Sequence, residues 1–326
     1  MNRTYLLVFA IVTAFTGAAQ STAGITGIPD TSYTNYSAYQ NTVKDYPYIK
    51  LVEDLDFPGV LSNKNIAYCT IGSRQLKLDV FYPEEKANSP RIAIIFIHGG
   101  GWRTGNRSQH YALAKRLAKL GYVCITPEYR LSTEALYPAA VYDIKSALSW
   151  ARLHAGDYTI DTAKIVAAGF SAGGELAAFM GSTNGMKEFE GNNCNPGVSS
   201  SANAVVDIDG ILSFVHPESG EGDDTKRISA ATNWFGYPKK DNYQLWEQAS
   251  SLTHAGKQTP PTLFINSSVD RMHAGREDFI KILNRYTIYT ETKTFEGAPH
   301  SFCLFDPWFE PTLQYIDDFL KKVFAR

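Results

Sequence analysis

Short apolar segments alternate with amphipathic segments along most of this chain, and that alternation restricts the fold more than any other feature. The apolar segments cover residues 66–71, 76–82, 92–97, 122–126, 164–169, 204–208, 262–265 and 288–295. Segments with helical periodicity cover residues 111–120, 139–154, 172–181, 276–285 and 312–324. Short buried strands separated by helices are typical of βαβ units, whose sheet is covered on both faces. The sequence therefore predicts an α/β fold with a mostly parallel, doubly wound sheet.

The first 23 residues have the pattern of a secretory signal peptide and are set apart from the fold. Arg3 precedes an apolar run, and the small residues near Ala19 or Ala23 are typical of a cleavage site. Polar residues interrupt the run before it reaches the roughly 20 apolar residues that a membrane-spanning helix needs. We therefore expect an exported protein, periplasmic or extracellular, without stable membrane insertion.

Residues 24–326 are expected to form one domain that carries a small polar cap. The chain has 326 residues, of which 44% are hydrophobic, so it can bury a large core. Its formal net charge of -2 makes a nucleic-acid partner unfavourable. Insertions at residues 184–201 and 214–256 interrupt the alternation, and we interpret the second as a cap over a site, because long loops are often functional. The oligomeric state is not readable from the sequence.

A G-x-S-x-G motif lies between a predicted strand and a predicted helix. Gly169, Ser171 and Gly173 occupy its fixed positions, and the helix is expected to start at Ala172. This strand–turn–helix context is the one that a nucleophile elbow requires. A helix N-terminus also favours developing negative charge, because its first N–H groups are free. Ser171 is therefore the candidate nucleophile.

A serine hydroxyl needs a base, and the base needs a third group that holds its tautomer. His300 follows the last predicted strand, and Asp270 lies shortly after the strand at residues 262–265. Ser171, Asp270 and His300 stand in the chain order of such a triad. Alternatives remain at His254 and His273 for the base, and at Glu277 and Asp278 for the acid.

Three consecutive glycines follow a buried strand in the segment HGGGW. Backbone N–H groups can stabilise an oxyanion only if no side chain blocks the approach, so we expect Gly100, Gly101 and Ala172 to form an oxyanion hole. His98 is expected to hold this loop by hydrogen bonds. Trp102 is expected to form a wall of the substrate pocket.

The remaining motif search predicts no cofactor and no metal. The histidines show no ligand spacing, and the glycines show no nucleotide-binding spacing. The four cysteines leave one disulfide open to an exported chain, and the sequence does not assign its pairing. They are Cys69, Cys124, Cys194 and Cys303.

The motifs HGGGW, GFSAGG, SSVDRMHAG and APHSF resemble the α/β-hydrolase family, in the hormone-sensitive-lipase-like and carbohydrate-esterase-like branch that carries H-G-G-G. The similarity runs from about residue 76 to the C-terminus. Two segments, INSSVDRMHAGREDF and HSFCLFDPWFEPTLQYIDDFLKKVF, further resemble secreted bacterial esterases associated with pectin breakdown. The chain departs from the family at Asn266 and Ser267, where a His-Gly pair is common.

This resemblance implies a serine esterase that removes acetyl groups or galacturonate methyl esters from plant polysaccharide. Aromatic rings stack on sugars and arginine attracts a uronate carboxylate, so Trp102, Trp308 and Arg271 are candidate substrate-binding residues. Two alternatives remain open, an exported serine peptidase of the same fold and a non-catalytic carbohydrate-binding protein.

Overall fold

A computed structural model describes residues 19–86, 89–191 and 194–325, so residues 1–18 of the predicted signal peptide lie outside the described part. Eight strands form one sheet in the spatial order β2-β3-β5-β4-β6-β7-β8-β9. Strand β3 is antiparallel to β2 and β5, and all neighbours from β5 to β9 are parallel. The strands are β2 (Val60–Ile71), β3 (Arg74–Pro83), β4 (Arg91–Ile97), β5 (Val123–Pro127), β6 (Ile160–Phe170), β7 (Ala204–Ile208), β8 (Thr262–Asn266) and β9 (Thr290–Thr294).

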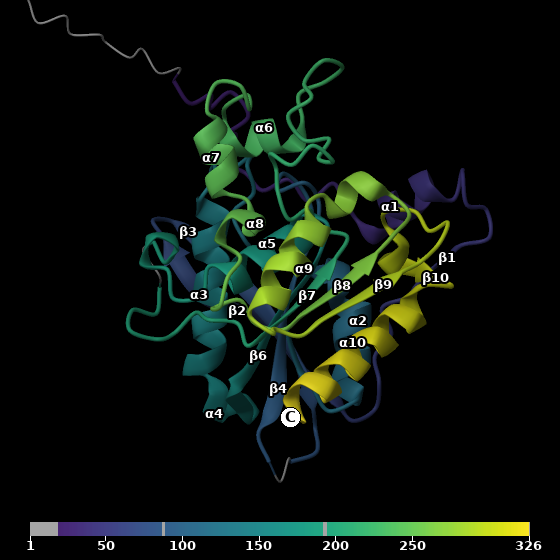
Figure 1. Cartoon of the computed structure of the whole chain (residues 1–326). Coiled ribbons are helices and arrows are strands. Elements are labelled where there is room, and N and C mark those ends of the chain that lie inside the picture. The colour runs from purple at the N-terminus through teal and green to yellow at the C-terminus, as the bar shows by residue number, and fades with distance from the viewer. Residues whose placement is uncertain (1–18, 87–88, 192–193, 326) are drawn as a thin grey trace, which may run out of the picture.

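Helices cover both faces of this sheet (Figure 1). A second sheet of two short strands, β1 (Lys50–Leu51) and β10 (Phe305–Asp306), lies beside it. The helices are α1 (Asn35–Thr42), α2 (Tyr111–Lys119), α3 (Ala139–Leu153), α4 (Ala155–Tyr158), α5 (Ala172–Ser182), α6 (Ala230–Phe235), α7 (Tyr243–Gln248), α8 (Ser251–His254), α9 (Arg276–Arg285) and α10 (Phe309–Phe324). Short 3-10 turns are η1 (Arg107–His110), η2 (Lys187–Phe189), η3 (Asp270–His273) and η4 (Phe302–Leu304). The predicted mostly parallel α/β architecture is confirmed.

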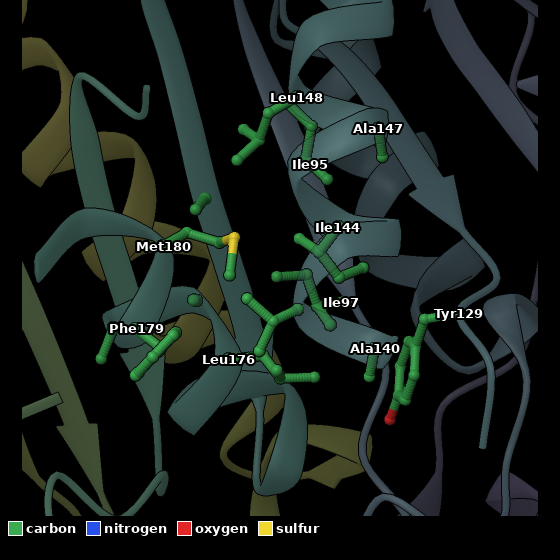
Figure 2. Close-up of a cluster of buried hydrophobic side chains, with 14 of the residues drawn as sticks. Ile95, Ile97, Tyr129, Ala140, Ile144, Ala147, Leu148, Leu176, Phe179 and Met180 are labelled. Atoms are coloured by element: carbon green, nitrogen blue, oxygen red, sulfur yellow. The ribbon is translucent and has the colours of Figure 1, made fainter. Parts of the chain in front are cut away.

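Strand β4 shows why a continuous apolar run forms the centre of the sheet. Ile95 and Ile97 pack into the core under α3 and α5, where Figure 2 shows them among side chains such as Ile144 and Leu176. Their neighbours along the strand belong to the core on the opposite face, which α2 and α10 cover. Because helices cover both faces of the sheet at β4, every residue from Ala93 to Ile97 is fully buried.

Several element boundaries differ from the sequence prediction. Strand β2 begins six residues earlier than expected, because an exposed polar stretch still pairs with β3 at the edge of the sheet. Helix α10 begins at Phe309 and includes Pro311, which the first turn of a helix tolerates. Helix α1 was not expected; the side chain of Thr34 caps it by accepting a hydrogen bond from the backbone N–H of Ser37.

A disulfide joins Cys69 on β2 to Cys194 in the loop after η2. The two residues are 125 positions apart in the chain, so the bond ties the insertion at residues 184–201 to the edge of the sheet. Cys124 and Cys303 are buried free thiols. The pairing that the sequence left open is thereby defined.

The insertion at residues 214–256 contains α6, α7 and α8. Figure 1 shows α6 and α7 at the top of the molecule, beyond the carboxyl ends of the parallel strands. The indole of Trp234 on α6 stacks on that of Trp102 with centroids 4.9 Å apart, so the insertion packs directly on the glycine loop that follows β4. Within the described residues, no helix is long and apolar enough to cross a membrane.

Candidate active site

Ser171 sits on a sharp turn between β6 and α5. Its backbone has φ 58° and ψ -121°, an uncommon conformation for a residue with a side chain. The glycines around it are required by close packing. A Cβ on Gly169 would lie 2.1 Å from the carbonyl oxygen of Gly173, and one on Gly173 would lie 2.0 Å from that of Ile97. The turn therefore projects Ser171 from the end of the strand at the start of a helix.

The imidazole of His300 lies against this serine. Its Nε2 is 2.8 Å from Oγ of Ser171, and its ring packs on Phe170 with centroids 4.9 Å apart. The loop after β9 carries His300, as the sequence predicted. Residues 171 and 300 are thus brought within hydrogen-bonding distance from 129 positions apart.

The carboxylate that contacts His300 belongs to Asp209, which the sequence analysis did not select. Oδ2 of Asp209 lies 2.8 Å from Nδ1 of His300, and its side chain is fully buried just after β7. The predicted acid, Asp270, lies in η3 with its side chain 98% exposed, and its Oδ1 is 3.9 Å from Nε2 of His273. The assignment of Asp270 as the partner of His300 is therefore wrong.

The other candidates are also held elsewhere. Glu277 pairs with Arg276, and Asp278 pairs with Lys281 on the exposed side of α9. His254 contacts the carbonyl of Gln248 in the insertion.

Two hydrogen bonds from Ser267 and the turn that Asp207 closes fix the position of Asp209. The backbone N–H of Ser267 donates to its Oδ1 at 2.8 Å, and the Ser267 hydroxyl donates to its Oδ2 at 2.5 Å. Asp207, two residues earlier, accepts the backbone N–H of Gly210 at 2.7 Å and so closes the turn in which Asp209 has φ 54°. Burial raises the pKa of Asp207 well above its usual range. Asp209 is consequently held from both adjacent strands, β7 and β8.

The segment VVDIDG held the signal for this acid. It places two aspartates at the end of a buried strand, where a carboxylate is unfavourable unless it has a partner, and follows them with a glycine. Asp209 also preserves the chain order Ser, Asp, His, so that order did not distinguish it from Asp270. Ser267, one of the two residues at which the chain departs from the family, is a second signal. It does not lead to an acid after β8 but donates hydrogen bonds to Asp209.

The glycine loop lies directly against the elbow. A Cβ on Gly99 would stand 3.1 Å from Cβ of Ser171. Gly100 has φ 127° and Gly101 has φ 60°, so both adopt backbone conformations that glycine favours. In the described part of the chain, the backbone N–H groups of Gly100, Gly101 and Ala172 have no protein acceptor. These donors remain free for a bound group.

His98 holds the loop, as expected, and does so as a neutral imidazole. Its Nδ1–H donates to the carbonyl of Gly99 at 2.9 Å, and its ring stacks on Tyr129 with centroids 4.4 Å apart. The Tyr129 hydroxyl in turn donates to the backbone carbonyl of His98 at 2.9 Å. Burial lowers the pKa of His98 to about 4.

The predicted substrate-binding residues lie in three different environments. Trp102 is only 4% exposed, and its Nε1–H donates to Oε2 of Glu175 at 3.0 Å. Trp308 is 8% exposed and packs edge-on against tyrosines of the N-terminal segment. Both tryptophans are therefore packing residues, which corrects the expectations that Trp102 forms a pocket wall and that Trp308 stacks on a sugar. Arg271 is exposed in η3 and lies beside Gly220 of the insertion.

The N-terminal segment links the two loops that carry the site. The carbonyl of Asp30 accepts the N–H of Gly105, four residues after Gly101. The hydroxyl of Thr42 lies 3.1 Å from that of Ser301, next to His300. Among the described residues, no group of His, Cys, Asp and Glu side chains is arranged to hold a metal ion.

Comparison with known proteins places this geometry in a family. The family model described as BD-FAE matches residues 78–275, more than half of the chain. The chain is 29% identical over 258 residues to Esterase LipC of Mycobacterium tuberculosis, an alignment that covers 76% of this chain and 62% of LipC. The chain thus spans less than two thirds of the length of this relative.

Two solved structures have the same arrangement of elements. The bifunctional GH43-CE protein of Bacteroides eggerthii superposes with a TM-score of 0.68 and 25% identity, covering 80% of this chain and 38% of that chain. A thermophilic esterase from the Planctomycetes species Thermogutta terrifontis, with propionate bound, superposes with a TM-score of 0.65 and 27% identity, covering 85% of this chain and 97% of that chain.

Proposed function

The chain belongs to the BD-FAE family of α/β-hydrolases, and on that premise we propose that it is a serine-dependent carboxylic ester hydrolase. One observation carries the proposal. An unbroken hydrogen-bonded series runs from Oγ of Ser171 through the imidazole of His300 to the carboxylate of Asp209, with both contacts at 2.8 Å. Nucleophile, base and orienting acid are the three roles that acyl transfer through a serine requires.

In the first half-reaction, Ser171 attacks the carbonyl carbon of the ester while Nε2 of His300 takes the proton from its Oγ. The carbonyl oxygen becomes an oxyanion, which the free N–H groups of Gly100, Gly101 and Ala172 stabilise. His300 then gives the proton to the departing alcohol oxygen, and the carbon–oxygen bond breaks. Asp209 stabilises the imidazolium that forms between these two steps.

The second half-reaction removes the acyl group from Ser171. His300 takes a proton from a water molecule, whose oxygen attacks the acyl carbon and forms a second oxyanion in the same cradle. The proton then passes from Nε2 to Oγ of Ser171 as the acid leaves. The products are one alcohol and one carboxylic acid, and Ser171 is regenerated.

For the substrate, we propose short ester groups on plant polysaccharide, acetyl groups or galacturonate methyl esters in pectin. The Bacteroides eggerthii neighbour is a bifunctional protein that joins a CE module to GH43, which supports a carbohydrate substrate. The propionate in the Thermogutta terrifontis esterase supports a short acyl group. Arg271, exposed beside the insertion, is the residue proposed to attract a uronate carboxylate.

We also propose that the protein is exported to the periplasm or the extracellular space. The apolar N-terminal run with its small residues supports a signal peptide. The disulfide between Cys69 and Cys194 supports an oxidising compartment, because such bonds persist there.

The test compares substrates on one preparation. The mature chain is incubated with acetylated pectin and with methyl-esterified pectin, and released acetate and methanol are assayed. In parallel, a fluorophosphonate probe is used to label the wild type and Ser171→Ala. We expect stoichiometric labelling of the wild type, no labelling of the variant and release of one of the two products. A chain that binds pectin without being labelled would be a non-catalytic carbohydrate-binding protein, and cleavage of peptides in place of esters would indicate a peptidase.

A further inference from the structure

Glu175 is a fully buried acid in an otherwise apolar helix. It lies on α5, four positions after Ser171, and its side chain is 1% exposed. Its backbone N–H donates to the carbonyl of Ser171 at 3.0 Å, so its position follows that of the elbow. Burying an acid is unfavourable unless hydrogen bonds compensate for the lost water, and the side chain of Glu175 accepts such a bond from Trp102.

The environment of Glu175 favours the neutral form of its side chain. Burial raises the pKa of this carboxyl group well above its usual range. The hydrogen bond from Trp102 acts in the opposite direction but is the smaller influence. A carboxylate here would oppose the negative charge that develops beside Ser171, whereas a neutral acid does not repel an oxyanion.

Trp102, the partner of Glu175, is the residue directly after the glycine loop. It has φ 55°, and its indole plane lies 8° from that of Trp234, on which it stacks. Its carbonyl accepts the N–H of Ser132 at 2.7 Å, and its Nε1–H donates to Oε2 of Glu175 at 3.0 Å. The hydrogen bond to Glu175 ties this loop to the helix of the nucleophile.

We propose that Glu175 is a positioning residue for the oxyanion hole. By accepting the indole N–H of Trp102, it fixes the glycine loop after β4 relative to the N-terminus of α5. The N–H groups of Gly100 and Gly101, on the loop, and of Ala172, on the helix, then face one oxyanion. The inference rests on the proposed function, because it assigns a role in that same reaction.

The test uses four variants and separates kcat from KM. Glu175→Leu removes the acceptor, Trp102→Phe removes the donor and keeps a ring on Trp234, and Glu175→Gln keeps a neutral acceptor. Trp246→Phe is the matched control, because it removes an indole N–H bond to the carbonyl of Tyr237 within the insertion. We expect kcat to fall about tenfold in the Leu and Phe variants at positions 175 and 102, with KM within about twofold. Glu175→Gln and Trp246→Phe should stay within about threefold of the wild-type kcat.

Two further readouts distinguish positioning from simple packing. The inhibition constant of a trifluoromethyl ketone, which forms an oxyanion on Ser171, should rise by the same factor as kcat falls. The double variant Glu175→Leu with Trp102→Phe should be no slower than the slower single variant, because both remove one contact. The folded fraction of each variant is measured by circular dichroism. If Glu175→Leu does not fold, Trp102→Phe and Glu175→Gln decide the question.

Unchanged ketone affinity, additive losses in the double variant, or a Gln variant as slow as the Leu variant would each overturn the proposal. A failure of the proposed function looks different. In that case Ser171→Ala would retain activity, or the wild type would not react with the fluorophosphonate. The labelling of the wild type therefore tests the proposed function independently of the variants at Glu175.

Discussion

Oδ2 of Asp209 lies 2.8 Å from Nδ1 of His300, although the two residues are 91 positions apart in the chain, and this acid directly follows β7. In the sequence-based assignment, the acid followed β8. The observed acid is fully buried, whereas the assigned one, Asp270, is 98% exposed. This single contact determines which substitutions should affect the chemistry.

Asp209→Asn should lower kcat on p-nitrophenyl acetate by about four orders of magnitude, because an amide no longer orients the imidazole correctly or stabilises its charged form. Asp270→Asn is the matched control and should retain kcat within about twofold. Steady-state kinetics on both purified variants check the prediction. Equal losses in the two variants would contradict the observed arrangement.

Ser267→Ala should lower kcat about tenfold with little change in KM. It removes the hydroxyl that donates to Oδ2 of Asp209, the same oxygen that contacts His300, and hydrogen bonds to charged groups contribute about 1.5–3 kcal/mol. Ser182→Ala removes an equally buried hydroxyl whose acceptor is the carbonyl of Phe179 on α5, and it should not change kcat. A tenfold loss in both variants would point to general destabilisation.

Gly169→Ala should destabilise the protein by about 3 kcal/mol or more, because the added methyl group would lie 2.1 Å from a backbone carbonyl. Gly156→Ala in α4 is the control, since nothing lies within 4 Å of its added methyl group. We expect that change to stabilise the helix slightly, by about 0.5–1 kcal/mol. Urea unfolding followed by fluorescence compares the two.

Replacing Cys69 and Cys194 together by alanine should cost about 2–5 kcal/mol of stability. The bond joins residues 125 positions apart and therefore restricts the unfolded chain strongly. Differential scanning calorimetry should show a lower Tm for the double variant and for the reduced wild type. Adding reductant to the double variant should change nothing, and a further drop in its Tm would mean that reductant acts elsewhere.

The stability of the Glu175→Gln variant relative to the wild type should increase with pH. The pKa of Glu175 is raised in the folded state, whereas in the unfolded chain a glutamate ionises near pH 4.3. The folded wild type therefore holds one more proton above that pH, so its stability falls as the pH rises, by at most about 1.4 kcal/mol per unit. Gln does not titrate. Urea unfolding at pH 4, 5.5 and 7 measures the difference in free energy of unfolding between the two proteins. A difference that does not change with pH would refute the prediction.

Most of the architecture was predictable from local patterns. Fully buried strands such as β4 appear as uninterrupted apolar runs, and the elbow around Ser171 is marked by glycines that close packing requires. Helix α1 was missed because its residues are polar, and the capping pair of Thr34 and Ser37 is a weaker signal than an apolar stripe.

The errors concern contacts between distant segments. Trp102 resembles an exposed pocket wall in the sequence, but Trp234 of the insertion covers it, and no local pattern encodes that stacking. Asp270 satisfies the chain order Ser, Asp, His, and Asp209, which was not among the candidates, satisfies it equally. Only the spatial arrangement of β7 and β8 shows which carboxylate reaches the imidazole.

Because the acid of the triad follows β7, catalysis does not constrain the sequence of the turn between β8 and α9. Since Asp209 is held by β7 and by Ser267, the exposed residues Asp270 and Arg271 take no part in proton transfer. Substitutions in this turn, natural or engineered, can therefore adapt the protein to a new polymer without disturbing the groups that cleave the ester.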